Sequence, residues 1–145
     1  MRPAWRTTLP SKHREHIAHV AAGDASASRE MALRITRALG PWDECLAWAT
    51  DWDVWEDEED WPRYYAWRAQ YGEKRSARAA PGHLFGATDG RSLEEFIAHV
   101  IECGWDVTLL PARSGRPTGV RAHTSHDEWV ELRASAPFDF NRPAV

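Results

Sequence analysis

Histidine and carboxylate side chains gather in one short segment near the C-terminus, where His123, His126, Asp127 and Glu128 fall within six residues. Imidazole and carboxylate groups are common ligands of zinc and other divalent metals, and they also serve as general acids and bases. His83, in a Pro-Gly segment, could join them if the fold brings the two regions together. One interpretation is therefore a small metal-dependent hydrolase centred on His123, His126 and Asp127, with His83 as a further ligand.

The spacing of these residues matches no specific metal signature, and it also has a purely structural explanation. Asp127 could cap a turn, His126 could bond to a backbone carbonyl, and Glu128 could remain solvated. The sequence contains no G-x-S-x-G, no G-x-x-x-x-G-K-[ST] and no H-E-x-x-H motif. The sequence therefore favours a protein that is not an enzyme, predicts no cofactor and leaves the hydrolase as an alternative.

A second constellation combines carboxylates with tryptophan. Residues 42–61 hold nine Asp and Glu residues and no Lys or Arg, whereas 1–41 and 62–80 each carry a net charge of +4. The chain has nine tryptophans, more than a domain of 145 residues can easily bury. We define the acidic block as the run that contains Asp51, Trp52, Asp53, Trp55, Glu56, Asp57, Glu58, Glu59 and Asp60.

The acidic block has the chemistry of a protein-binding surface. Exposed aromatic side chains often anchor an interface, while carboxylates steer a basic partner and repel nucleic acid. Our leading prediction is therefore a binding module for a basic protein, for example an inhibitor that occludes a basic toxin or nucleic-acid enzyme. The neighbouring basic segments could instead neutralise the block within the fold. A third alternative is a structural or assembly subunit, in which exposed tryptophans mediate homo-oligomerisation.

The spacing of apolar residues predicts the helices that would position these groups. Helical spacing predicts helices over 12–22 and 25–39, the second with Asp24 before it and Gly40-Pro41 after it. A short helix is predicted from 41 to 49 and an aromatic one from 61 to 71. Ser92 and Glu95 have the spacing of a capping box, which predicts a helix over 92–103 that ends before Gly104.

After Gly104 the period of the apolar residues changes from about 3.6 to 2, which is typical of strands. We predict strands over 105–110, 120–124 and 129–133 that form an antiparallel meander. Residues 81–86 are predicted to form a loop with buried Leu84 and Phe85. The predicted fold class is α+β, with a helical N-terminal half packed on a helix and a three-stranded meander. It is a single domain over 1–145, loosely ordered at 1–10 and 137–145.

The cysteines and the lengths of the apolar runs indicate where in the cell the protein is expected. Cys45 and Cys103 are far apart and form no C-x-x-C pair, which argues against a disulfide framework or a zinc ribbon. No run approaches the roughly 18 apolar residues of a membrane-spanning helix, and the first residues lack the apolar core of a signal peptide. We therefore expect a cytoplasmic protein that binds neither membranes nor nucleic acid.

Three short strings resemble a pattern in small uncharacterised bacterial proteins. They are Pro81-Gly82-His83-Leu84-Phe85, Gly104-Trp105-Asp106 and Ser125-His126-Asp127-Glu128. The resemblance covers roughly the C-terminal half and implies no activity. In size and acidity the chain also looks like the immunity proteins of bacterial toxin systems. An immunity-type inhibitor of a basic bacterial toxin is therefore the most specific form of the leading prediction.

Overall fold

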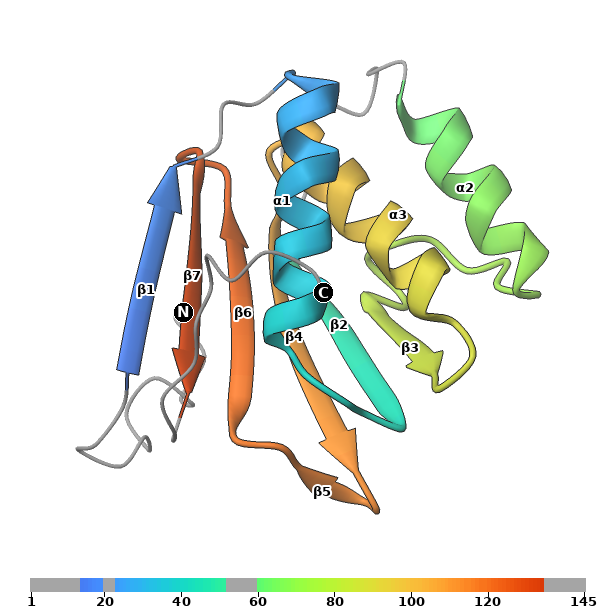
Figure 1. Cartoon of the computed structure of the whole chain (residues 1–145). Helices are drawn as coiled ribbons and strands as arrows, with labels where there is room; N and C mark the ends of the chain where they lie inside the picture. Colours follow the sequence, from blue (N-terminus) through green and yellow to red (C-terminus); the bar gives the residue numbers. More distant parts are fainter. Residues whose placement is uncertain (1–13, 20–22, 52–59, 135–145) are drawn as a thin grey trace.

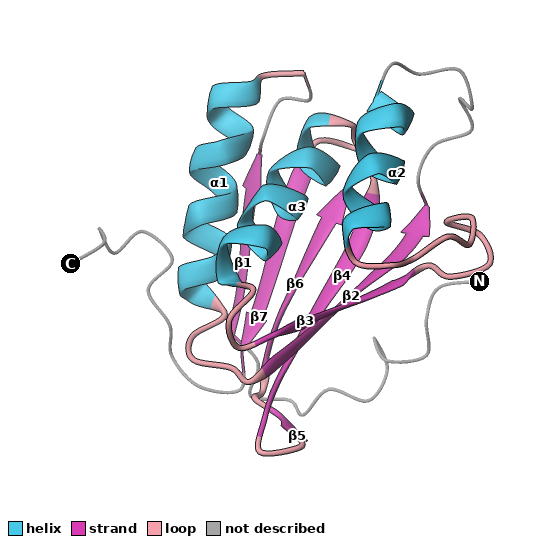
Figure 2. Cartoon of the chain, turned by 90° about the vertical axis from the view of Figure 1, so that its right-hand side faces the viewer, coloured by secondary structure: helices cyan, strands magenta, loops and turns pink. Residues whose placement is uncertain are grey.

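The computed structural model describes residues 14–19, 23–51 and 60–134 of the chain. Within these ranges a single antiparallel sheet is covered on one face by three helices (Figures 1 and 2). The elements in chain order are β1 (Arg14–His19), α1 (Ala25–Ala38), β2 (Glu44–Asp51), α2 (Asp60–Gln70), β3 (Gly82–Gly86), α3 (Gly90–Glu102), β4 (Asp106–Arg113), β5 (Arg116–Pro117), β6 (Val120–Ser125) and β7 (Trp129–Ala134). None of the described helices is long and apolar enough to cross a membrane.

The strand order explains why the helices share one face. The strands lie in the order β1-β7-β6-β4-β2-β3, with β5 paired to β4, and every pair is antiparallel. β3 and β4 flank β2 and therefore run in the same direction, so α3 must cross over the sheet to connect them. β1 and β2 also run in the same direction and are connected through α1. Both crossovers pass over the same face, as the preferred handedness of such connections requires.

The first helix forms as its sequence predicts. Asp24 is its N-cap, and the Asp24 carboxylate accepts a 3.0 Å hydrogen bond from the backbone N–H of Ala27. Met31 and Ile35, one turn apart, are buried in the core. Gly40 follows the C-cap with φ of 71°, a left-handed conformation that favours glycine. The prediction of a helix over 25–39 is confirmed, and α2 likewise confirms the aromatic helix over 61–71.

The third helix is confirmed, but its predicted capping box is wrong. α3 begins at Gly90, so Ser92 and Glu95 lie inside the helix. The N-cap is Asp89, whose carboxylate accepts a 2.8 Å hydrogen bond from the N–H of Gly86 and closes the connection from β3. This tight turn starts the helix earlier than local spacing suggests, and Ser92 instead accepts a hydrogen bond from the Tyr71 hydroxyl.

The short helix predicted over 41–49 is wrong, because this segment contains the interior strand β2. Its side chains alternate: Cys45, Ala47 and Ala49 are buried toward the helices, while Trp48 is exposed on the opposite face. Alanine favours helices in isolation, but β2 pairs with β3 on one side and β4 on the other. Pairing on both sides outweighs the local preference.

Two further segments predicted as helix or loop are also strands. Residues 14–19, within the predicted helix 12–22, form edge strand β1 and pair with β7. Residues 82–86, predicted as a loop, form edge strand β3, in which Phe85 is buried and Leu84 is exposed. The predicted burial of Phe85 is confirmed and that of Leu84 is wrong. Pairing between distant segments decided both cases, and local spacing carries no signal of it.

The mixed α+β class is confirmed, and the predicted arrangement is not. The predicted C-terminal strands correspond to β4, β6 and β7, which lie side by side and antiparallel. They do not form a separate meander, because β2 and β3 extend the same sheet beyond β4 and β1 extends it beyond β7. The described part of the first half therefore contributes two strands, β1 and β2, as well as two helices, and the core lies between the sheet and the helical layer.

Candidate functional site

The predicted acidic binding face falls largely outside the described residues. Asp51 ends β2 and Asp60 begins α2, which brackets the block between two ordered elements. The other members of the block, namely Trp52, Asp53, Trp55, Glu56, Asp57, Glu58 and Glu59, lie outside the described residues. Of the block, the structure therefore describes its two ends, and the surface at the end of β2 adjoins Asp51.

The four residues of the predicted metal site are not brought together. His83 lies on β3 opposite Ala47, and its ring is buried on the helical side of the sheet. His123 lies on the other face, where its Nδ1 is 2.9 Å from the Thr108 hydroxyl. His126 and Asp127 are in the turn between β6 and β7, with His126 Nε2 3.5 Å from the Asp127 carboxylate. The sheet itself therefore separates His83 from the other three.

His126 instead meets two aspartates that sequence spacing does not connect with it. Its backbone N–H and its Nδ1 lie 2.7 and 2.9 Å from the same oxygen of Asp106, the first residue of β4. Asp51 pairs with Asp106 across the sheet, after a register shift that leaves Thr50 as the extra residue. Among the described residues, this is the group of three whose ligand atoms all lie within 4.8 Å of one another. Hydrogen bonding to Asp106 raises the pKa of His126.

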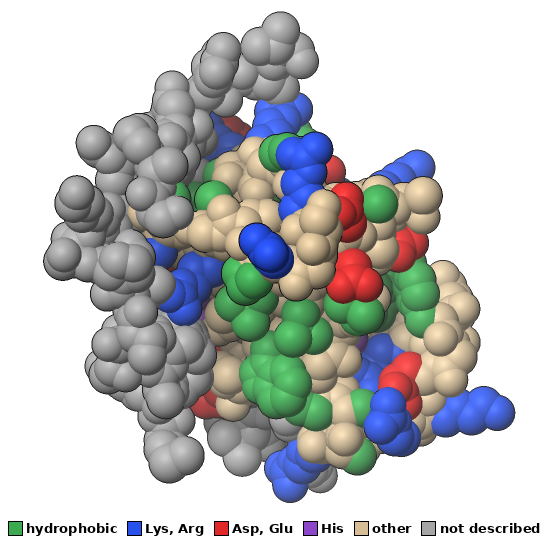
Figure 3. Space-filling view, turned by 90° about the horizontal axis from the view of Figure 1, so that it is seen from below, with side chains coloured by type: hydrophobic (Ala, Val, Ile, Leu, Met, Phe, Trp, Pro, Cys, Tyr) green, Lys and Arg blue, Asp and Glu red, His purple; other side chains and the backbone are tan. Residues whose placement is uncertain are grey.

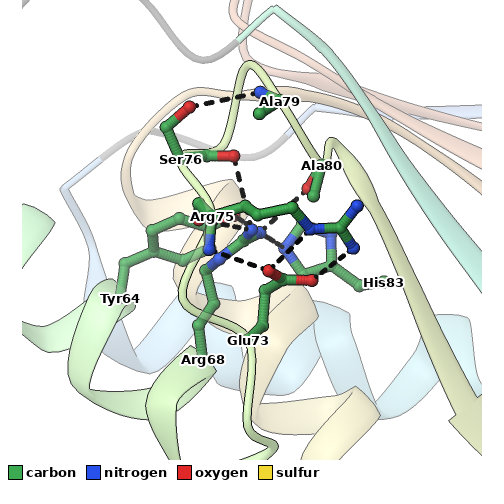
Figure 4. Close-up of polar contacts among 8 residues, drawn as sticks. All are labelled: Tyr64, Arg68, Glu73, Arg75, Ser76, Ala79, Ala80 and His83. Carbon is green, nitrogen blue, oxygen red and sulfur yellow. Dashed lines mark hydrogen bonds and ion pairs between the residues drawn. The ribbon is translucent and has the colours of Figure 1, made fainter.

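A buried polar network connects α2 to β3 (Figure 4). Arg68 is 2% exposed, and its Nη1 lies 2.8 Å from both the Tyr64 hydroxyl and the His83 Nε2. The same group donates to the carbonyl of Ala80, and Nη2 donates to that of Arg75. Because Arg68 can only donate, Nε2 of His83 must accept, which places the ring proton on Nδ1. The Tyr64 hydroxyl lies 2.6 Å from the same nitrogen, whose single lone pair is therefore shared between the hydroxyl and the guanidinium.

The network holds structure together and has no group suited to acid–base chemistry near neutral pH. Burial, with a smaller contribution from the charge of Arg68, lowers the pKa of His83 to about 4. Burial raises the pKa of Tyr64 to about 12 despite the opposing effect of Arg68. Both groups are therefore neutral at pH 7. Arg68 fixes the connection between α2 and β3 through the carbonyls of Arg75 and Ala80.

A pocket of about 280 Å³ opens beside this network, between α2 and α3. Four of its lining residues carry rings, two contribute Gln and Glu side chains, and one is small: Tyr64, Trp67, Phe96, His99, Gln70, Glu95 and Ala66. The ring centroids of Trp67 and Phe96 are 5.3 Å apart, and those of Tyr64 and His99 are 6.1 Å apart with nearly parallel planes. The spacing of Tyr64 and Trp67 in the sequence predicted an aromatic face on α2, but it did not predict a pocket beside that face.

The face of the sheet opposite the helices carries an exposed apolar cluster, which we call the open-face patch. Leu46 on β2 pairs with Leu84 on β3 and with Leu110 on β4, so the three form one row across the sheet. Trp48, two residues along β2, lies over Gly82, where an added Cβ would come within 3.4 Å of its ring. Leu84, Trp48 and Leu110 are 64%, 45% and 37% exposed. Hydrophobic side chains gather on the side of the molecule seen from below in Figure 3.

Comparison with known proteins adds no family to this description: no family model, no curated protein and no solved structure matches the chain. Function is therefore argued from the sites themselves, since a fold alone does not define an activity.

Proposed function

We propose that this chain is a protein-binding module whose contact surface is the open-face patch. The observation that carries the proposal is the exposure of Trp48 beside a continuous row of leucines, on a face that none of the described helices covers. An exposed tryptophan surrounded by other apolar side chains is a typical anchor of a protein interface. β3 is also an edge strand, to which a partner strand could add through its backbone.

The charge around the patch favours a basic partner. Asp51 and Asp106 lie where β2 ends and β4 begins, on the same strands that carry Trp48 and Leu110. In the sequence the acidic block continues directly from Asp51. A partner with an apolar centre and basic residues on one flank would complement this arrangement. In its most specific form the proposal is an immunity-type inhibitor of a basic bacterial toxin or nucleic-acid enzyme.

Site-specific photo-crosslinking tests this proposal. A photoreactive residue at position 84 should capture a partner in the native host, and calorimetry with the purified partner should then show weaker binding by Trp48→Ala. Tyr71→Ala is the matched control, because Tyr71 is an exposed aromatic residue on the helical side of the molecule. Equal affinities of the wild type and Trp48→Ala would refute the proposal. Capture of a second copy of the chain would favour the assembly-subunit alternative.

A second candidate function is the binding of a divalent cation by Asp51, Asp106 and His126. The observation that favours it is the convergence of two carboxylates and one imidazole from β2, β4 and the β6–β7 turn. Three protein ligands leave a fourth zinc position for water, which is the number of protein ligands found in hydrolytic zinc sites. The metal-dependent hydrolase alternative therefore rests on His126 with Asp51 and Asp106.

Zinc titration tests this second candidate. Zinc should raise the melting temperature of the wild type, and His126→Ala and Asp106→Asn should each remove the effect. Asp43→Asn is the control, because that carboxylate accepts a hydrogen bond from the N–H of Ser114 elsewhere on the surface. If zinc stabilises all four proteins equally, or none of them, these residues are not a metal site.

A further inference from the structure

We propose that the pocket between α2 and α3 binds a small ligand with a planar aromatic ring and a cationic nitrogen, such as an arylalkylamine. The pocket is lined by residues of α2 and α3, which lie on one side of the sheet (Figure 2), whereas the open-face patch lies on the other side. It is therefore a site separate from the protein-binding surface. Its volume of about 280 Å³ is near the lower end for small-molecule sites, which suits one or two fused rings.

The walls of the pocket favour a flat ring. Two pairs of rings line the pocket. The ring planes of Trp67 and Phe96 are 26° apart, and those of Tyr64 and His99 are 4° apart. Aromatic pairs gain from offset stacking and edge-to-face contact as well as from burial. These rings are already fixed by their neighbours, because Tyr64 also packs edge-on against Trp105 and Trp67 packs against Phe85. A ligand would therefore meet a largely preformed surface.

The charge at the pocket favours a cation. Glu95 is the acidic residue in the lining, and no Lys or Arg is among the described lining residues. The carboxylate of Glu95 is 3.2 Å from Nε of Arg91, whose side chain is 93% exposed. Exposed pairs of this kind contribute little, so a ligand cation can replace Arg91. Gln70 supplies an amide for a further hydrogen bond, and the faces of the rings attract positive charge.

Arg68 is the group that would favour an anion instead, and its geometry argues against that role. Its guanidinium is buried behind Tyr64, 5.3 Å from the centroid of that ring, and it is not part of the pocket lining. Its Nη1 and Nη2 groups already donate to Tyr64, His83 and backbone carbonyls, and its Nε is buried away from the surface. A ligand in the pocket therefore meets the carboxylate of Glu95 and not the guanidinium of Arg68.

Three probes with the same ring and different charge test the proposal by isothermal titration calorimetry: tryptamine, indole and indole-3-acetate. Tryptamine should bind the wild type about two- to fivefold more tightly than indole, as expected for one partly exposed ion pair. Indole-3-acetate should bind more weakly than indole. Glu95→Gln should bring tryptamine to the affinity of indole, whereas the neighbouring Glu94→Gln, outside the lining, should leave the preference unchanged.

A second variant shows whether the probes occupy this pocket. Ala66 lines it from an exposed position on α2, so Ala66→Trp should fill the cavity without disturbing the core. Circular dichroism should confirm that the variant is folded, and all probe binding should be lost. The proposal is overturned if no probe binds the wild type, if indole-3-acetate binds best, or if Ala66→Trp binds tryptamine as the wild type does.

Discussion

At the scale of single residues, Arg68 makes several buried hydrogen bonds that connect α2 to β3. A guanidinium at 2% exposure is costly to desolvate, and its hydrogen bonds to Tyr64, His83 and the connection from α2 to β3 offset that cost. Arginine suits this role because its planar fork can reach several acceptors at once. The network thus fastens α2 to the sheet beside the pocket.

Arg68→Met should reduce the free energy of unfolding by about 2–4 kcal/mol. The change removes the buried charge but leaves the carbonyls of Arg75 and Ala80 without their donor, and each unsatisfied buried group costs about 1–3 kcal/mol. Urea denaturation measures the loss, and Arg116→Met, on the exposed strand β5, provides the control. An Arg68→Met protein as stable as the wild type would show that the network does not stabilise the fold.

The depressed pKa of His83 predicts a loss of stability on acidification. The ordinary pKa is 6.5 and the folded value is about 4, so between these pH values only the unfolded chain takes up the proton. The contribution of His83 is therefore complete above pH 6.5 and declines as the pH falls toward 4, by at most about 1.4 kcal/mol per pH unit. The difference in stability between the wild type and His83→Gln, measured across this range, should show this slope. A pH-independent difference would contradict the assignment.

At the scale of elements, β3 illustrates how adjacent residues of one strand serve opposite surfaces. Phe85 packs against Trp67 and Phe96 in the core, whereas Leu84 belongs to the open-face patch. Phe85→Ala should cost about 3–5 kcal/mol. Leu84→Ala should change stability by no more than about 0.5 kcal/mol, as is usual on a surface. Thermal unfolding of the two variants compares them directly, and equal losses would mean that the patch is part of the core.

The caps of α1 and α3 allow a similar comparison. Asp24→Ala should cost about 1 kcal/mol, because it removes the acceptor for the N–H of Ala27. Ser92→Ala should cost less, since Ser92 lies within α3 and is bonded to the partly exposed Tyr71. Chemical denaturation of both variants tests this order. A larger loss of stability for Ser92→Ala than for Asp24→Ala would indicate that Ser92 caps α3.

At the scale of the whole molecule, the helices cover one face of the sheet and leave the open-face patch on the other. Asp51, the first residue of the acidic block, ends β2, the strand that carries Trp48, so a carboxylate and the apolar surface share one strand. Attraction between an acidic surface and a basic partner acts at long range and is screened by salt. The two features would therefore contribute differently to binding, the carboxylates to the association rate and Trp48 to the dissociation rate.

Neutralising Asp57, Glu58 and Glu59 together should slow association with the basic partner at low salt and leave thermal stability within about 1 kcal/mol of the wild type. Stopped-flow mixing at two salt concentrations measures the first effect and calorimetry the second. Trp48→Ala should instead shorten the lifetime of the complex. A large loss of stability in the triple variant would mean that the block is neutralised within the fold and is not a binding face.

Local sequence was sufficient for features that are encoded within a few residues. Asp24, Gly40 and the apolar spacing between them predicted α1, and the change of period at Gly104 predicted β4. Capping, glycine conformation and amphipathic spacing act between near neighbours in the chain, so they can be recognised without the fold.

Only the tertiary structure decided the features that depend on pairing between distant segments. The segment 44–51 is a strand because β3 and β4 pair with it, although its alanines favour a helix. His126 lies beside Asp106 and Asp51, not His83, because the sheet places the ends of β2 and β4 next to the β6–β7 turn. The partners of Arg68 likewise come from α2, β3 and the connection between them. Contacts of this kind form only when strand order and the helical crossovers are fixed, and no local pattern specifies them.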